Sequence, residues 1–182
     1  STHYTLTKQK EDISMKSITV MLLVVAVSIS LAAPVASAQV TDPVGEYAAL
    51  KGVETTKIVF DVRTGVPKIA ALQLKLISQT HKDLIAEKKT PVSTVVFIGQ
   101  SVKLVSSNRE GFTPEELLLL DEIASTVSAL SKDGIGLELC LFAAKVHKVD
   151  PASVLPAITK VENGYISVIG YQAKGYSLVP VY

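Results

Sequence analysis

The spacing of hydrophobic positions changes repeatedly along the chain, between short apolar runs typical of strands and the spacing typical of helices. Each change predicts the start of a new element. Short, mostly apolar segments predict strands over residues 56–63, 95–98, 135–140, 158–162 and 176–181. Apolar residues at helical spacing predict helices over residues 69–89, 114–132, 141–147 and 165–174. Strands and helices therefore alternate. This order predicts an α/β fold of three layers, with a mostly parallel sheet of about five strands, helices on both faces and right-handed crossovers.

The pattern also assigns faces and ends to some of these elements. The run Val95–Ile98 is continuously apolar, as expected of a strand that is covered on both faces. In the helix over 69–89, His81 is expected on the solvated face, and one apolar stripe is expected to face the core: Ile69, Leu72, Leu76, Ile77, Leu84 and Ile85.

Local signals mark where several helices begin and end. Thr113 and Glu116 flank Pro114 in the arrangement of a capping box, so Glu115 and Glu116 need no role as an acid/base pair. Asn163 is expected to cap the start of the last helix, and Gly175 its end.

The N-terminal part of the chain has a different organisation. The segment 18–31 carries no charge, follows Met15 and Lys16, and leads to Ala36-Ser37-Ala38, which together indicate a cleavable signal peptide over 15–38. A membrane anchor is the alternative, but the uncharged run is short for a span of about 20 residues. We therefore expect a periplasmic or otherwise exported protein with no membrane insertion after cleavage. Residues 1–14 are interpreted as an upstream leader or expression remnant, 39–54 as an N-terminal arm and 55–182 as the α/β domain.

Composition and charge narrow the function. The chain has 182 residues, of which 48% are hydrophobic and 19% charged, as in a globular domain. Basic and acidic residues balance within 39–182 and form no basic run, which argues against nucleic-acid binding. Glycine-rich phosphate loops, a nucleophile elbow and paired metal-ligand spacings are absent from the sequence, so we expect no metal and no organic cofactor.

Cys140 is the only cysteine, and it stands where a predicted strand ends and a helix begins. In parallel sheets, ligands bind at the carboxyl ends of the strands, and the free amides of a following helix would favour a thiolate. The residue can equally be a buried apolar side chain or an intermolecular link.

His147 is interpreted as a solvated residue at a helix end. The tyrosines near the C-terminus are interpreted as packing or subunit-interface residues: Tyr165, Tyr171, Tyr176 and Tyr182.

Four segments taken together resemble the DsrE/DsrF-like sulfur-relay family: Lys57–Phe60, Val95–Leu104, Gly136–Cys140 and Gly164–Leu178. The likeness extends from about Lys57 to Val181. It implies an α/β domain that assembles as homotrimers or hexamers, and a cysteine at the place of Cys140 that carries sulfane sulfur as a persulfide. Relatives often have a histidine where this chain has Ile98, so any role of that histidine is missing here.

The leading hypothesis is an exported sulfur carrier, sulfurtransferase-like if active, with Cys140 as nucleophile and persulfide site. Its partners would be a sulfur donor or acceptor protein or a small sulfur compound. This mechanism requires the sulfur of Cys140 to reach solvent. The alternative is a non-catalytic, exported, oligomeric binding module of the same fold.

Overall fold

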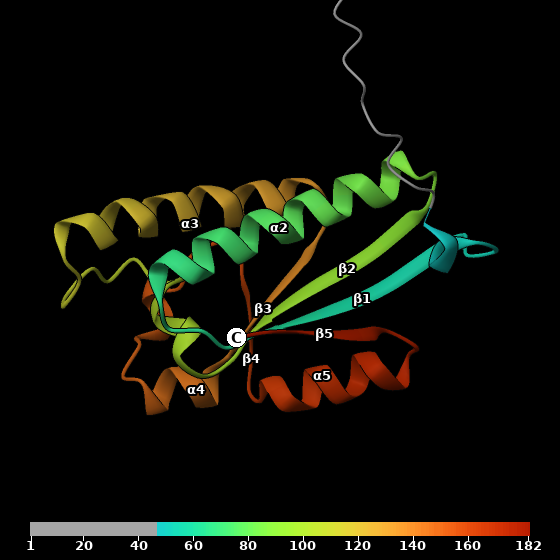
Figure 1. Cartoon of the computed structure of the whole chain (residues 1–182). Coiled ribbons are helices and arrows are strands. Elements are labelled where there is room, and N and C mark those ends of the chain that lie inside the picture. Colours follow the sequence, from blue (N-terminus) through green and yellow to red (C-terminus); the bar gives the residue numbers. More distant parts are fainter. Residues whose placement is uncertain (1–46) are drawn as a thin grey trace, which may run out of the picture. The chain divides into compact units, whose positions relative to one another are not determined.

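A computed structural model of the chain describes residues 47–182 (Figure 1). The predicted leader, the signal peptide and the first part of the N-terminal arm lie outside the described residues. The described part of the arm contains a short 3₁₀ helix, η1 (Ala48–Leu50), before the first strand begins.

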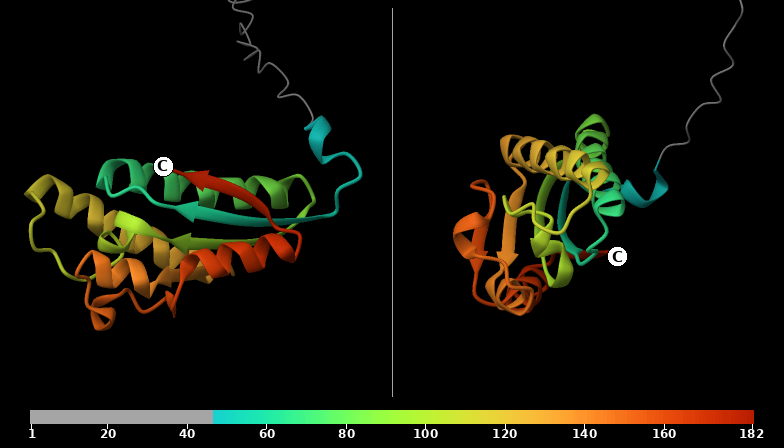
Figure 2. Two further views of the ribbon diagram at one scale, coloured as in Figure 1. Left: turned by 90° about the horizontal axis from the view of Figure 1, so that it is seen from below. Right: turned by 90° about the vertical axis from the view of Figure 1, so that its left-hand side faces the viewer.

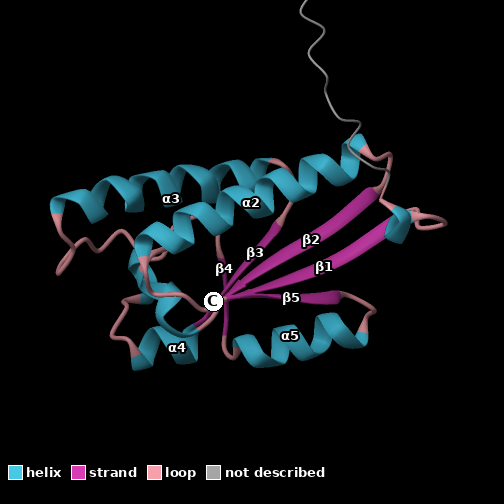
Figure 3. Ribbon diagram, in the orientation of Figure 1, coloured by secondary structure: helices cyan, strands magenta, loops and turns pink. Residues whose placement is uncertain are grey.

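All strands of the domain belong to one parallel sheet, in the order β4-β3-β2-β1-β5. Figure 3 shows them as one layer between the helices. The order places β1 and β2 inside the sheet, and β2 is buried at its carboxyl end, as its apolar run predicts. The strands are β1 (Thr55–Val62), β2 (Thr90–Phe97), β3 (Gly136–Cys140), β4 (Thr159–Val161) and β5 (Ser177–Val181).

Helices cover both faces of this sheet (Figures 1 and 2). One face carries α2 (Pro67–Ala86) and α3 (Pro114–Lys132), and the other carries α4 (Leu141–Val146) and α5 (Gly164–Ala173). Two further 3₁₀ helices, η2 (Gly99–Lys103) and η3 (Pro151–Ser153), lie in the connections. The predicted three-layer α/β class, with a parallel sheet of five strands, is confirmed.

The capping signals act as expected. The Thr113 hydroxyl accepts a hydrogen bond from the Glu116 amide, and the Glu116 carboxylate accepts one from the Thr113 amide, which completes the capping box of α3. The Asn163 side chain accepts a hydrogen bond from the Tyr165 amide at the start of α5. Gly175 follows α5 with a φ of 83°, the left-handed conformation that ends many helices.

The buried face of α2 shares only Ile77 with the predicted stripe. Ile69, Leu72 and Leu76 are exposed, as is Ile85. The buried residues of α2 are Pro67, Ala70, Ala71, Leu74, Ile77 and His81. Both stripes satisfy helical periodicity. The stripe that contains alanines packs toward the sheet, because small side chains let the helix approach the sheet closely.

The expectation that His81 is solvated is likewise wrong. His81 is buried, and its Nδ1 lies 3.5 Å from the Ser93 hydroxyl of β2. The position follows from the rotation of α2, which turns the Ala70–Leu74–Ile77 face, and His81 with it, toward the sheet. This polar contact gives the buried ring a partner.

No helix within residues 47–182 combines the length and the apolar character needed to cross a membrane. The same residues bring no three histidine, cysteine or acidic side chains together as metal ligands.

Candidate functional site

Cys140 lies at the carboxyl end of β3, as the sequence predicts, and is also the N-cap residue of α4. The Ala143 amide donates a hydrogen bond of 3.4 Å to its Sγ. The first amides of a helix have no partner within that helix, so a side chain at the N-cap is the natural acceptor. Strand and helix meet without a loop, and this junction brings the sulfur to the start of α4.

Cys140 is buried beside Ile98 and Gly164. Cys140 itself is only 1% exposed, and Ile98 is also buried. A Cβ added at Gly164 would lie 2.9 Å from both Cys140 Cβ and Ile98 Cγ1, so the first turn of α5 rests directly on both side chains. The register pairs Phe97 with Leu139, and continuing it by one residue sets Ile98 beside Cys140. Cys140 therefore lies at the carboxyl edge of the sheet, and the first turn of α5 packs over it.

The close approach at Gly164 leads to a prediction. Gly164→Ala is expected to lower the free energy of unfolding by about 1–3 kcal/mol, because the new methyl overpacks against Cys140 and Ile98. Gly170→Ala is the matched control in the same helix, where an added Cβ meets nothing within 4 Å. That change is expected to raise stability by about 0.5–1 kcal/mol through helix propensity. Urea unfolding of both variants measures the difference, and equal shifts would contradict the contact.

A charged group lies near the carboxyl end of β1, which is separated from β3 by β2. Asp61 of β1 is 4% exposed, and its Oδ2 accepts hydrogen bonds from Arg63 Nε at 2.8 Å and Nη2 at 2.6 Å. Arg63 Nη1 donates to the Tyr165 hydroxyl at 3.0 Å, and the guanidinium carbon lies 4.9 Å from the centre of the Tyr165 ring. Hydrogen bonding to Asp61 raises the pKa of Arg63 above its ordinary value, although partial burial opposes the shift. Arg63 thus ties the start of α5 to β1.

Arg63 of this ion pair lies in the same row of the sheet as the cysteine, and Asp61 lies one row deeper on the same face. Val62 pairs with Phe97, so the next residues, Arg63 and Ile98, are neighbours, and Cys140 follows on β3. Neighbours in a parallel register point to the same face of a sheet. Arg63 and Cys140 therefore flank Ile98 beneath the first turn of α5.

A second carboxylate, that of Glu138, shares the row of Asp61 under α5, because Asp61 pairs with Val96 and Val96 with Glu138. The Tyr171 hydroxyl donates a 2.7 Å hydrogen bond to Glu138 Oε1, and Tyr171 also packs on Tyr176 with 4.9 Å between ring centres. Burial, followed by the bond to Glu138, raises the pKa of Tyr171. Glu138 Oε2 and Asp61 Oδ1 are buried without a hydrogen-bond partner among the described residues.

Sequence reasoning did not single out Arg63, Asp61 or Glu138. A signal existed in the strands, because Asp61 and Glu138 each interrupt a mostly apolar segment. An acidic residue in such a segment needs a partner when it is buried. The partner of Asp61, Arg63, is two residues away, whereas the partner of Glu138, Tyr171, is distant in the sequence and only the fold brings it close.

Comparisons with known proteins agree with this architecture. No family model matches the chain. An uncharacterized protein of Aquifex aeolicus is 27% identical over 125 residues, which are 68% of this chain and 55% of that protein. The chain thus spans about half the length of this curated relative.

Two solved structures resemble the domain. A protein of unknown function from Methanobacterium thermoautotrophicum, MTH1491, aligns with a TM-score of 0.54 and 16% identity. The ychN protein from E. coli, which has a DsrE/DsrF-like fold, aligns with a TM-score of 0.50 and 9% identity. Each alignment covers 69% of this chain and 98% of the other. At these identities the likeness supports the DsrE/DsrF-like fold and carries no information on activity.

Proposed function

We propose that the protein is an exported sulfur carrier of the DsrE/DsrF-like fold, with Cys140 as the residue that accepts and passes on sulfane sulfur. The observation that supports this proposal is the position of the thiol. It stands at the carboxyl end of a central parallel strand and accepts a hydrogen bond from the first turn of α4. The donor and acceptor would be partner proteins or small sulfur compounds.

The transfer step balances without a cofactor. The Cys140 thiolate attacks the outer sulfur of a persulfide donor, RS–SH, so that a bond forms between Sγ and that sulfur while the S–S bond of the donor breaks. The donor leaves as the thiolate RS⁻ with the electron pair, and Cys140 holds the persulfide. Passing the sulfur to an acceptor thiolate is the same exchange in the other direction. The Ala143 amide would stay hydrogen-bonded to the anionic sulfur.

Burial of the sulfur places a condition on this mechanism. Cys140 is 1% exposed and Gly164 packs against it, so the proposal requires the first turn of α5 to move before a donor reaches the sulfur. Such an opening is a local fluctuation of one helix end and leaves the sheet intact.

The deciding experiment incubates the purified protein with polysulfide and measures its intact mass. The proposal expects the wild type to gain the mass of one or more sulfur atoms, and Cys140→Ser to gain none. A wild type that acquires no sulfur, although the thiol is alkylated after unfolding, would rule the carrier function out.

Assembly into a homo-oligomer is part of the proposal. Phe142 and Val146 of α4 and Ile166 and Ile169 of α5 are each at least 60% exposed, and both helices cover the same face of the sheet (Figure 1). Exposed apolar side chains grouped on one face are typical of an interface. Light scattering should therefore give the mass of a trimer or hexamer, and Ile166→Glu should dissociate it. Leu118→Glu on α3, an equally exposed apolar position on the opposite face, is the control.

Export rests on the apolar segment 18–31 and the Ala36-Ser37-Ala38 site. N-terminal sequencing of the native protein should begin just after Ala38. Retention of residues 15–38 would instead indicate a membrane anchor.

A non-catalytic binding module is the second candidate, and the burial of Cys140 favours it. In that case the thiol is an apolar packing residue and alkylates slowly in the folded protein at every pH. The same protein would acquire no sulfur from polysulfide.

A further inference from the structure

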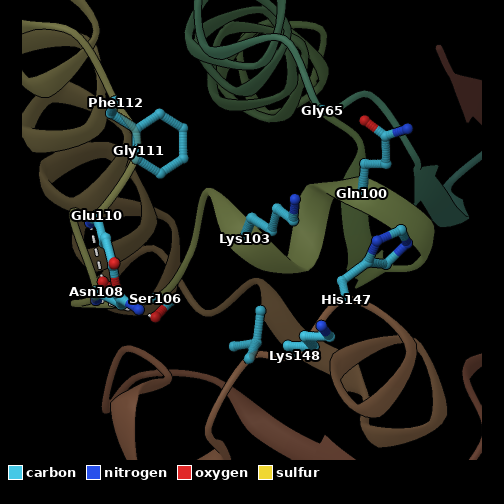
Figure 4. A pocket seen from close by; sticks show the side chains of 11 residues that line it. Gly65, Gln100, Lys103, Ser106, Asn108, Glu110, Gly111, Phe112, His147 and Lys148 are labelled. Carbon is cyan, nitrogen blue, oxygen red and sulfur yellow. Dashed lines mark hydrogen bonds between the residues drawn. The ribbon is translucent and has the colours of Figure 1, made fainter.

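A cavity of about 340 Å³ lies at the carboxyl edge of the sheet and does not include Cys140 among its lining residues. Its walls come from the segments that follow β1, β2 and α4 (Figure 4). Loops converge at this edge of a parallel sheet, and small-molecule sites are common there. The volume is within the range of pockets that hold small organic ligands.

Positively charged groups predominate in this cavity. Lys103 and Lys148 line it together with His147, and none of the three makes a hydrogen bond or ion pair through its side chain within residues 47–182. Glu110 is the opposing charge. Figure 4 shows Lys103 extending from η2 toward the space between Phe112 on one side and Gln100 on the other. Two lysines against one carboxylate leave a net positive site.

Lys148 is the residue that follows the C-cap of α4. Lys148 has a φ of 56°, a left-handed conformation that favours glycine. A lysine in this position retains backbone strain that a glycine would remove. Lys88 has the same conformation (φ 60°) after the C-cap of α2, so this strain belongs to the helix end and is independent of the cavity.

The opposite wall is held in place by one long-range and one local hydrogen bond. The Ser107 amide donates to the Ser153 carbonyl at 2.7 Å, and the Glu110 amide donates to Asn108 Oδ1 at 2.9 Å. A cavity whose loops are already fixed loses little conformational entropy when a ligand binds.

We propose that this cavity binds a small organic molecule that bears a tetrahedral oxyanion, a phosphate or sulfate ester. Lys103 and Lys148 contact the oxyanion, and Phe112 contacts the apolar part. Ammonium groups make charge-assisted hydrogen bonds to such oxygens, and the cavity has room for more than the oxyanion itself. The site is separate from Cys140 and does not depend on the sulfur-carrier function.

Calorimetric titration of the purified protein with phenyl phosphate, phenyl sulfate and phenol tests the proposal. At least one ester should bind and phenol should not, and the tighter ester identifies the class of oxyanion. Lys103→Gln and Lys148→Gln should each weaken binding roughly tenfold or more, because each removes a charged hydrogen-bond donor. Lys145→Gln is the matched control, since Lys145 is on α4 outside the cavity lining.

Two further variants separate this site from other effects. Lys148→Gly should raise the melting temperature by relieving the backbone and still lose binding, which distinguishes a lost ligand contact from misfolding. Cys140→Ser should bind the ester as the wild type does, so failure of the carrier function leaves this result unchanged. Absence of binding to either ester, or equal weakening by Lys145→Gln, would overturn the proposal.

Discussion

Replacing Arg63 with methionine is expected to lower the free energy of unfolding by about 3 kcal/mol, the lower end of the range for breaking a buried ion pair. Asp61 is 4% exposed, and its carboxylate would lose the guanidinium that now binds it. The Arg63 side chain is 34% exposed, so water can enter part of the vacated space and moderate the loss. The variant would also lose the bond to Tyr165 that holds the start of α5.

A matched surface pair provides the control for this measurement. Arg109 and Asp121 form an ion pair at 3.2 Å, but the Asp121 side chain is 74% exposed. Arg109→Met should therefore cost less than about 1 kcal/mol. Adding Asp61→Asn to Arg63→Met should recover part of the stability, since the unpaired charge is then gone. If urea unfolding gives equal losses in the free energy of unfolding for the two arginine variants, the burial of Asp61 does not increase the contribution of its ion pair.

Replacing Ile98 with alanine is expected to accelerate alkylation of Cys140 in the folded protein by roughly tenfold or more. Ile98 packs with Gly164 over the cysteine, and its truncation should cost about 3 kcal/mol through the void it leaves. If half of that loss destabilises the closed native state relative to the locally open state, the open state becomes about tenfold more populated. A difference of 1.4 kcal/mol corresponds to a factor of ten in the population ratio. The alkylation rate with iodoacetamide, measured well below the unfolding transition, reports the change.

Ile123→Ala separates local opening from general destabilisation. Ile123 of α3 is as deeply buried but packs on the other face of the sheet. It should lose similar stability and leave the alkylation rate near that of the wild type. If both variants accelerate alkylation equally, Cys140 reacts only in the unfolded chain, and the non-catalytic binding module becomes the better account.

These two predictions concern one row of residues that sequence reasoning could only partly anticipate. The position of Cys140 at a strand end follows from a local change of period, so it was predictable. Its burial depends on Gly164, which is far along the chain and lies over it only because α5 crosses back over the sheet. The ion pair between Asp61 and Arg63 is local, but its link to Tyr165 depends on the same crossover.

Helix α2 illustrates the limit for the fold itself. Its existence and approximate ends follow from apolar spacing and from Pro67 at its start, which act within a few residues. The rotation of α2 about its axis does not follow from local sequence, because two adjacent stripes have similar periodicity. The stripe with Ala70 and Ala71 is the one that packs toward the sheet. That choice also buried His81 against Ser93.

The sequence alone determined the alternation of strands and helices, the helix caps and the place of the single cysteine at a strand end, because these depend on neighbouring residues and short-range periodicity. Only the tertiary structure decided that Cys140 is covered, that Arg63, Ile98 and Cys140 share one row, and that Lys103 and Lys148 line one cavity. Those features arise from the register of parallel strands and from crossovers between distant segments, which local patterns do not encode.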